Sequence, residues 1–376
     1  MKVAMMLEPK KSFLFSAYPA LEDKLPYVRL GNHPSPIERL SGLERELSMT
    51  TVYMKNEGKV SDIYGGNKIR KLEFLLGAAL KAKKEHTLTF GYAGSNHTLA
   101  VAIFSRKLGM RPISLHLDQP NARYVRRNLL YQKALGTDLF LFRNMNRITA
   151  GSYAIYLWRL LTSGKFPAVI PPGGSSPPGA IGTSGGIHEL FYQIKNGELP
   201  TPDRIYLPIG SSGTTAGLAL GIKALRLKTK LVAVAVTPQR YSGFENIKNI
   251  FDGAVILLSH HIPDFPPLTL EEGEIEIRRE YLGDGYTRFT PEGMEAVKLL
   301  KKTDSLELEG TYTGKAMACL IDDARKGLIK GKTVLFWNTC NAVDFSQKID
   351  GVDWRTLPKE YHHYYEEDFQ PLEIRD

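Results

Sequence analysis

The sequence predicts an α/β fold with parallel sheets that carry helices on both faces. Three observations lead to this class: strand-like runs alternate with helix-like runs, the strand-like runs are apolar almost throughout, and glycine-bearing loops lead from strands into helices. Strands that are buried on both faces have this continuous apolar character, and alternation with helices is typical of parallel sheets. At roughly 100 to 200 residues per domain, the 376 residues suggest two domains.

The first half of the chain shows the alternation most clearly. From Asn67 onward apolar residues recur at helical spacing, and Asn67 is placed to cap that helix. Further elements are expected at 86–91 (strand), 98–108 (helix), 111–117 (strand), 121–135 (helix) and 137–142 (strand). Gly109 and Gly136 stand where the two helices should stop.

A long loop is expected after residue 142, and the alternation resumes beyond it. The pattern predicts a strand at 203–210, a helix from about 215 to 227, a strand at 230–237 and a last strand at 332–339. The acidic tail, 364–376, is compatible with either a solvated or a packed terminus.

Composition excludes several classes of protein. With 43% hydrophobic and 24% charged residues, the chain is neither disordered nor a coiled coil. Cys319 and Cys340 are too few for a disulfide framework or a cysteine-built zinc site. No stretch approaches the roughly 18 apolar residues of a membrane span, so we expect a soluble, cytoplasmic protein. The net charge of +9 permits nucleic-acid binding but by itself indicates only anionic partners.

Some motif-like stretches do not carry the function that they imitate. Residues 310–315 and 327–333 resemble a nucleotide-binding P-loop, but three residues separate their glycines where that motif has four. No glycine fingerprint of a dinucleotide site opens a helix, so a simple hydride-transfer enzyme is not expected. The nine histidines lack the spacing of a metal site, and we expect no metal.

Lys68 is the residue whose position is most unusual. It follows two glycines in the first turn of a predicted helix, where the helix dipole disfavours a cation. A solvated lysine is the ordinary interpretation. Alternatively, the dipole and other nearby cations lower its pKa, which suits an amine that attacks an aldehyde or takes up a proton.

Three further loops could meet Lys68 in one crevice. The loop 91–97 offers Ser95, Asn96 and backbone amides to a carboxylate, and the glycine- and hydroxyl-rich loop 210–218 could wrap a phosphate at a helix N-terminus. Tyr312 stands just before another helix. A phosphate site, a carboxylate site and a reactive lysine together suggest an amino acid bound to pyridoxal phosphate.

Six segments also resemble, in order, those of the D-cysteine desulfhydrase and aminocyclopropanecarboxylate deaminase family. They are YGGNKIRKLEFLLGAAL, GSNHTLAVA, IPPGGSSPPGAIG, PIGSSGTTAGL, GDGYTRFTPEGMEAV and TYTGKAMACLID. The resemblance runs from about residue 28 to about 345 and implies a pyridoxal-phosphate enzyme of the tryptophan-synthase-β-like fold (fold type II). It further implies a large cofactor-binding domain of 1–70 and 181–376, a small mobile domain of 71–180, and a homodimer.

The resemblance assigns a role to each site residue. Lys68 would carry the cofactor as a Schiff base and serve as the base at Cα, and Tyr286 and Tyr312 would exchange protons with the substrate. The cofactor would be held by Lys68, Asn67, Asn96, Ser211, Ser212, Gly213, Thr214, Thr215 and Thr339. The substrate would be bound by Ser95, Asn96, His97, Tyr286 and Tyr312, with Ser95 also counted as catalytic.

The same resemblance favours α,β-elimination on a small amino acid. Thr339 would be a hydroxyl partner for the pyridine nitrogen, and a hydroxyl holds a proton there less firmly than a carboxylate. Thr313 and His97 match the desulfhydrase branch, where the deaminase branch has Glu and Gln. The expected products are a 2-oxo acid, ammonia and sulfide or another leaving group.

Some positions depart from the family pattern and keep alternatives open. Lys55, Asn56 and Glu57 replace a usual Lys-Arg-Asp-Asp, Tyr64 stands just before the two glycines, and Cys340 and Asn341 replace two glycines after Thr339. We expect all of these positions to line or border the pocket. Ring opening of an aminocyclopropanecarboxylate, another deaminase or racemase reaction, and a catalytically inactive relative are the alternatives within the family. A basic nucleic-acid-binding protein is the alternative outside it, although we expect a small amino acid as partner and neither nucleic acid nor membrane.

Overall fold

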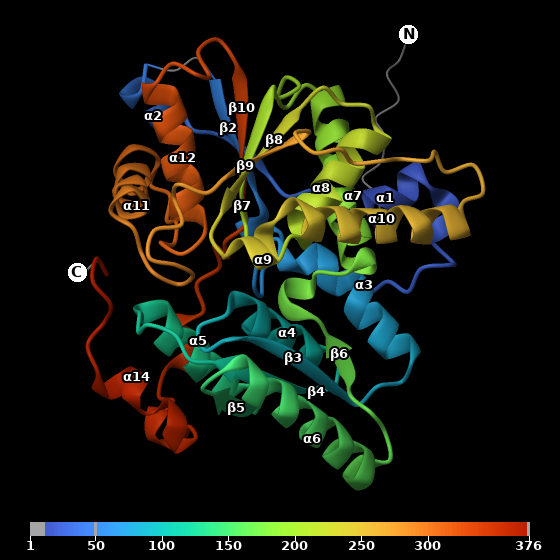
Figure 1. The fold of residues 1–376 in the computed structure, drawn as a ribbon, viewed down its shortest axis with the longest axis vertical. Coiled ribbons are helices and arrows are strands. Elements are labelled where there is room, and N and C mark those ends of the chain that lie inside the picture. Colours follow the sequence, from blue (N-terminus) through green and yellow to red (C-terminus); the bar gives the residue numbers. More distant parts are fainter. Residues whose placement is uncertain (1–11, 49–50, 374–376) are drawn as a thin grey trace.

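Two sheets form the framework of the molecule, of which the computed structural model describes residues 12–48 and 51–373 (Figure 1). In this part of the chain the larger sheet has the strand order β1-β2-β10-β7-β8-β9, and the smaller has the order β5-β4-β3-β6. Every pairing is parallel except that of β1 with β2. The predicted α/β class with parallel sheets is therefore confirmed.

The strands are short. The larger sheet contains β1 (Ile37–Arg39), β2 (Thr51–Asn56), β7 (Arg204–Ile209), β8 (Lys230–Ala235), β9 (Ile275–Arg278) and β10 (Thr333–Asn338). The smaller sheet contains β3 (His86–Tyr92), β4 (Arg111–Leu117), β5 (Asp138–Phe142) and β6 (Ala168–Ile170).

Helices cover both faces of the larger sheet. One face carries α7 (Pro177–Lys195), α8 (Gly213–Ala224) and α10 (Phe244–His261), with α1 (Phe13–Ala17) and α3 (Lys68–Lys81) packed on α7. The other face carries α2 (Ser41–Glu46), α11 (Pro291–Asp304) and α12 (Thr313–Arg325). The short elements nearby are α9 (Gln239–Ser242), η1 (Pro19–Leu21) and η2 (Glu57–Lys59).

The smaller sheet is likewise enclosed on both sides. One face packs on α4 (Asn96–Lys107) and α5 (Arg123–Ala134), and the other on α6 (Met145–Ser163). Residues Pro172–Gly174 form η3. The C-terminal segment contributes α13 (Ser346–Ile349), η4 (Trp354–Thr356), η5 (Lys359–Tyr361) and α14 (His363–Glu366), and it lies against α5 (Figure 1). Within the described part of the tail, Tyr364 and Gln370 are buried and Glu366, Glu367 and Asp368 are exposed, so the tail is packed at Tyr364 and Gln370 and solvated between them.

The prediction of a long loop after residue 142 is wrong. This stretch holds α6, β6 and the whole of α7. The interior of α7 is rich in glycine, which disfavours a helix in isolation. Its glycines allow close packing: a Cβ on Gly182 would stand 2.1 Å from the Arg70 carbonyl oxygen, and one on Gly217 of α8 would stand 2.5 Å from that of Ala180. Close helix packing therefore overrides local propensity here.

The smaller sheet and its helices lie within residues 71–180, the range expected for a small domain. The domain boundaries themselves, and any motion between the two parts, stay predictions. Among the described residues no helix is both long and apolar enough to cross a membrane.

Candidate active site

A cavity of about 600 Å³ opens where several strands of both sheets end. Residues directly following β7, β8 and β10 line it, together with the loop after β3. The carboxyl ends of parallel strands are the usual place for ligand sites in such sheets. The structure brings all of the predicted site residues to this cavity: Asn67, Lys68, Ser95, Asn96, His97, Ser211, Ser212, Gly213, Thr214, Thr215, Tyr286, Tyr312 and Thr339.

Lys68 is the first residue of α3 and is positioned by the two glycines before it. Gly66 has a φ of 102°, and a Cβ there would stand 2.9 Å from the Thr339 carbonyl oxygen, so this approach requires glycine. The Lys68 Nζ donates to Asn67 Oδ1 at 2.9 Å, and Asn67 Nδ2 donates to Thr214 Oγ1 at 2.8 Å. Asn67 is the N-cap residue of α3, as expected, but its side chain makes no capping hydrogen bond and instead links Lys68 to Thr214 in the first turn of α8.

The pKa of Lys68 is lowered to about 8, and the cause is burial. The charges of Glu309 and Cys340 act in the opposite direction but do not outweigh it. The sequence suggested the helix dipole and nearby cations as the cause, so the direction agrees and the reason differs. A lysine with this pKa is partly neutral near neutral pH and can act as a nucleophile or a base.

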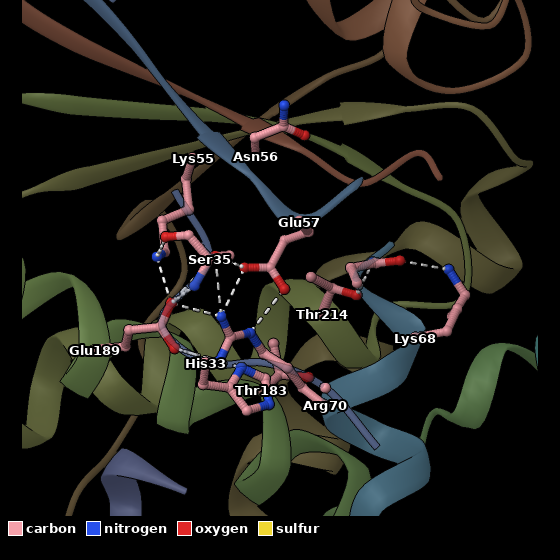
Figure 2. Close-up of polar contacts among 12 residues, drawn as sticks. His33, Ser35, Lys55, Asn56, Glu57, Lys68, Arg70, Thr183, Glu189 and Thr214 are labelled. Atoms are coloured by element: carbon pink, nitrogen blue, oxygen red, sulfur yellow. Dashed lines mark hydrogen bonds and ion pairs between the residues drawn. The ribbon is translucent and has the colours of Figure 1, made fainter. Parts of the chain in front are cut away.

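A cluster of buried charged side chains lies beside α3 (Figure 2). We call it the ion cluster. It consists of the cations His33, Lys55 and Arg70 and the carboxylates Glu57, Glu73 and Glu189.

Within this ion cluster, Arg70 Nε donates to Glu57 at 2.7 Å, and Arg70 Nη2 donates to Glu189 at 2.8 Å. The backbone carbonyl of Glu57 accepts from Gly66 N at 2.7 Å. The ion cluster thus fixes both the start of α3 and the glycine turn that precedes Lys68. Lys55 and Glu57 do not line the cavity, so these departures from the family pattern lie outside the pocket.

The loop before α8 has the donors of an anion site. Ser212 adopts a φ of 66° and donates its hydroxyl to the Tyr241 carbonyl at 2.7 Å. Ser175, which the sequence did not single out as a site residue, contacts Ser211 Oγ at 2.8 Å and accepts from Gly213 N at 3.1 Å. The first-turn amides of α8 can bind an anion, as amides at other helix N-termini do.

Thr215 supplies the direct test of whether a phosphate fits. Its Oγ1 is buried and has no hydrogen-bond partner among the described residues. A buried unpaired hydroxyl is costly, and an acceptor-rich phosphate at the start of α8 would satisfy it. The residues present therefore fit a phosphate group.

The loop 91–97 is organised by the start of α4. Ser95 is the N-cap residue, and its Oγ accepts from the amides of His97 and Thr98 at 3.2 and 3.3 Å. Asn96 Oδ1 accepts from Asn128 Nδ2 at 2.9 Å, which leaves the Asn96 amide NH₂ as the end that can donate to a ligand. Burial, with the charges of Lys68 and Lys71, holds the pKa of His97 well below its ordinary value. His97 is therefore neutral and can serve a carboxylate only through a hydrogen bond.

The two predicted tyrosines meet in the cavity. Their hydroxyl groups are hydrogen-bonded to each other, and the Lys68 Nζ lies 6.0 Å from the centre of the Tyr312 ring. Burial is the main cause that raises the pKa of both Tyr286 and Tyr312. Both phenols stay protonated near neutral pH, so either of them can donate a proton.

Glu309 is a site residue that was not predicted from the sequence. Its carboxylate lines the cavity and accepts from the amides of Tyr312 and Thr313 at 2.7 Å each and of Thr311 at 2.8 Å. Burial raises its pKa in spite of these bonds. The sequence offers one indication of its role, a carboxylate just before a predicted helix, which is a common capping arrangement. Glu307 has nearly the same position, so this pattern does not single out Glu309.

Asn341 shows how the chain accommodates one departure from the family pattern. Its Oδ1 accepts from Gly65 N at 2.6 Å, so this side chain holds the glycine turn before Lys68. Cys340 lies in the cavity wall, and burial raises the pKa of its thiol. These two residues and Tyr64 do line the pocket, as expected.

Comparisons with known proteins agree with this geometry. Residues 28–339 match the family described as "Pyridoxal-phosphate dependent enzyme". The chain is 32% identical over 321 residues to the "Putative 1-aminocyclopropane-1-carboxylate deaminase" of Pyrococcus abyssi, covering 85% of this chain and 93% of the relative. It is 32% identical over 324 residues to the D-cysteine desulfhydrase of Salmonella typhi, covering 85% and 95%.

Solved structures show the same likeness. A crystal structure of an ACC deaminase homologue superimposes with a TM-score of 0.73 at 30% identity, covering 89% of this chain and 95% of the other. A fungal L-serine ammonia-lyase from Rhizomucor miehei has a TM-score of 0.55 at 18% identity, covering 84% and 95%, and shares the fold.

Proposed function

This chain belongs to the family of pyridoxal-phosphate-dependent enzymes, and from this premise we propose that it is a lyase that eliminates a β-substituent from a small amino acid, as a D-cysteine desulfhydrase does. The observation that carries the proposal is the meeting of Lys68, the loop before α8 and the tyrosine pair in one cavity. The products would be a 2-oxo acid, ammonia and sulfide or another leaving group.

The cofactor would be held at three points of the cavity. Lys68 would bind it covalently, residues Ser211–Thr215 at the start of α8 would hold its phosphate, and Thr339 would face its ring nitrogen. When bound, pyridoxal phosphate supplies the electron sink that makes the Cα proton of an amino acid acidic. Asn67 would fix the spacing between the lysine and the phosphate loop, since it donates to Thr214 and accepts from Lys68.

The protein residues would divide the remaining tasks. Ser95 and Asn96 would orient the substrate carboxylate, with His97 as a neutral neighbour. A Lys68 amine with a pKa of about 8 would take the Cα proton. A protonated tyrosine of the Tyr286–Tyr312 pair would deliver a proton to the departing sulfur. Water would then release ammonia and the 2-oxo acid.

Two residues favour elimination over ring opening. Thr313 is fully buried, and its Oγ1 contacts Glu309 and not the cavity. His97 is buried and neutral and bonds Thr89 Oγ1 through Nε2 at 3.0 Å. The deaminase branch has Glu and Gln at these places. Ring opening of an aminocyclopropanecarboxylate is the second candidate, because relatives with that name cover most of the chain.

The buried charges weaken the nucleic-acid alternative. The basic excess of the chain is concentrated in residues 55–133. Lys55, Arg70 and Lys71 of that stretch are buried, so they form no basic surface. We propose a cytoplasmic enzyme with a small-molecule substrate, without a nucleic-acid or membrane partner, and a homodimer as its assembly.

A substrate screen tests the proposal. Purified holoenzyme is incubated with D-cysteine, L-cysteine, β-chloroalanine, cysteate and aminocyclopropanecarboxylate, and 2-oxo acid, ammonia and sulfide are measured. We expect pyruvate from one cysteine enantiomer with an equal amount of sulfide. A 2-oxo acid released only from aminocyclopropanecarboxylate would replace elimination by ring opening, and no product from any of them would refute the proposal.

A further inference from the structure

The C-terminal segment 357–370, here called the strap, lies beyond the residues that match the family. Hydrogen bonds nevertheless connect it to the loop that carries Ser95, through intervening residues, and directly to the loop that carries Tyr286. In Figure 1 the red C-terminal segment runs beside α5 and then rises toward the part of the molecule that holds the larger sheet. Leu357, Tyr361 and Tyr364 pack in one apolar cluster with α5. Three polar side chains of the strap, those of Tyr361, Tyr364 and Gln370, also form hydrogen bonds with residues outside this cluster.

Tyr361 begins a directed chain of hydrogen bonds that ends on the backbone of Ser95. Thr98 Oγ1 donates to the Ser95 carbonyl at 3.1 Å, so it must accept from His116 Nε2 at 3.1 Å. His116 Nδ1 is then the unprotonated nitrogen, and it accepts from the Tyr361 hydroxyl at 3.0 Å. Burial lowers the pKa of His116 to about 3, so this order of donors and acceptors holds throughout the physiological range.

Tyr364 reaches the same loop by a second route. Its hydroxyl donates to Asp118 Oδ1 at 2.5 Å and accepts from the Gln119 amide at 3.1 Å. The Gln119 side chain in turn accepts from Gly94 N at 2.9 Å. Gly94 directly precedes Ser95, so the two tyrosines of the strap hold the predicted carboxylate loop from two sides.

Gln370 connects the strap to the loop that carries Tyr286. Its Nε2 donates to the Thr287 carbonyl at 3.1 Å, and its Oε1 accepts from Phe289 N at 3.0 Å. Its own amide donates to the Asn121 carbonyl, at the start of the α5 region, at 2.8 Å. Thr287 has a φ of 65°, a conformation that needs outside support in a residue other than glycine. Gln370 therefore clamps the Tyr286 loop to the smaller sheet and its helices.

We propose that the strap is a positioning element of the active site, in which Tyr361 and Tyr364 set the Ser95 loop and Gln370 sets the Tyr286 loop. This inference rests on the proposed function for the roles of Ser95 and Tyr286. It goes beyond that function because it assigns a task to a segment outside the cavity. The positioning residues touch neither substrate nor cofactor.

Single-atom and single-group changes test the strap without removing it. Tyr361→Phe and Tyr364→Phe keep the apolar packing and delete only a hydroxyl, and Gln370→Ala deletes the clamp. Gln347→Ala is the matched control, because Gln347 is an exposed glutamine of α13, which precedes the strap in the chain. Each holoenzyme is assayed for sulfide release with the cysteine enantiomer that the wild type cleaves, and is examined by amide hydrogen exchange.

The two loops should respond separately. The tyrosine variants should raise KM about tenfold with kcat nearly unchanged, and Gln370→Ala should lower kcat about tenfold with KM nearly unchanged. Exchange should accelerate about tenfold in residues 92–98 for the tyrosine variants and in residues 283–290 for Gln370→Ala. The Gln347→Ala control should match the wild type in every measurement.

Gln370→Glu adds a pH signature that general destabilisation does not give. A protonated carboxyl can still donate to Thr287 and accept from Phe289, whereas an ionised one repels the Thr287 carbonyl. The kcat of this variant relative to wild type should therefore be close to one at low pH and fall as pH rises through the pKa of the introduced carboxyl.

Exchange that rises uniformly, or a ratio that does not change with pH, would overturn the proposal. If the wild type releases no product from any substrate of the screen, the proposed function fails, and the exchange of the two loops still decides whether the strap positions them.

Discussion

Replacing Glu189 by Gln is the sharpest perturbation of the framework behind Lys68. Glu189 is fully buried on α7 and accepts from Ser35 N at 2.7 Å, from Arg70 Nη1 and Nη2 at 3.0 and 2.8 Å, and from Lys55 Nζ. The ion cluster is neutral when His33 is protonated, with three cations and three carboxylates. The amide would leave it with an uncompensated positive charge and would turn a donor toward the donors of Arg70 or Lys55.

Removing one partner from a buried ion pair typically costs about 3–5 kcal/mol, and we expect Glu189→Gln to lower the free energy of unfolding by that amount. Urea unfolding followed by far-ultraviolet circular dichroism, at equal pyridoxal phosphate concentrations, measures it. The matched control is Glu295→Gln, because Glu295 pairs with Arg325 while 57% and 52% of the two side chains remain exposed. Such a pair should contribute less than about 1 kcal/mol. Equal losses in the two variants would refute the stabilising role of the ion cluster.

Three further perturbations test individual residues. Burial alone would lower the pKa of His33, but the carboxylates of the ion cluster raise this pKa to about 9. Protonated His33 therefore stabilises the fold fully below pH 6.5, the pKa of an unfolded histidine, and this stabilisation is lost as pH rises through 9. The advantage of wild type over His33→Gln in urea midpoint should therefore shrink between pH 6 and 9; an advantage that grows would contradict this. Gly213→Ala places a Cβ 2.5 Å from Ser175 Oγ and 2.8 Å from its Cα, and should weaken cofactor binding about tenfold or more in a fluorescence titration, a result that unchanged affinity would oppose. Of Tyr286→Phe and Tyr312→Phe, the variant that lacks the proton donor should lose about 100-fold or more in kcat with its cofactor absorbance intact; near-wild-type kcat in both would exclude the pair as donor.

The sequence predicts well where one local pattern decides the structure. The apolar runs that became β3 and β4 are such a case, since they are buried on both faces between helices. The predicted site residues converge because glycine- or hydroxyl-bearing loops follow strands whose ends meet at one edge. Their individual roles remain proposals.

Elements and contacts that depend on distant partners could not be predicted in this way. The glycines of α7 look unfavourable for a helix until Arg70 is seen to approach Gly182, and Gly217 of α8 is small enough to pack against α7 at Ala180. The ion cluster joins His33 to Glu189 across the whole of residues 71–180, and no local sequence pattern indicates such a pairing. The hydrogen bond between Tyr361 and His116 could not be predicted either, because the two residues are far apart in the sequence and only the folded structure brings them together.

The covalent attachment of pyridoxal phosphate to Lys68 is the central claim. Borohydride reduction of the holoenzyme, followed by peptide mass spectrometry, tests it directly. Lys71, one turn further along α3 and also buried with a strongly lowered pKa, is the competing amine. We expect the pyridoxyl mass on Lys68 in the wild type and in Lys71→Met, and on no lysine in Lys68→Ala, which should also lose the absorbance band of the bound cofactor. A pyridoxyl group on Lys71, or a wild-type protein that takes up no cofactor, would contradict the account.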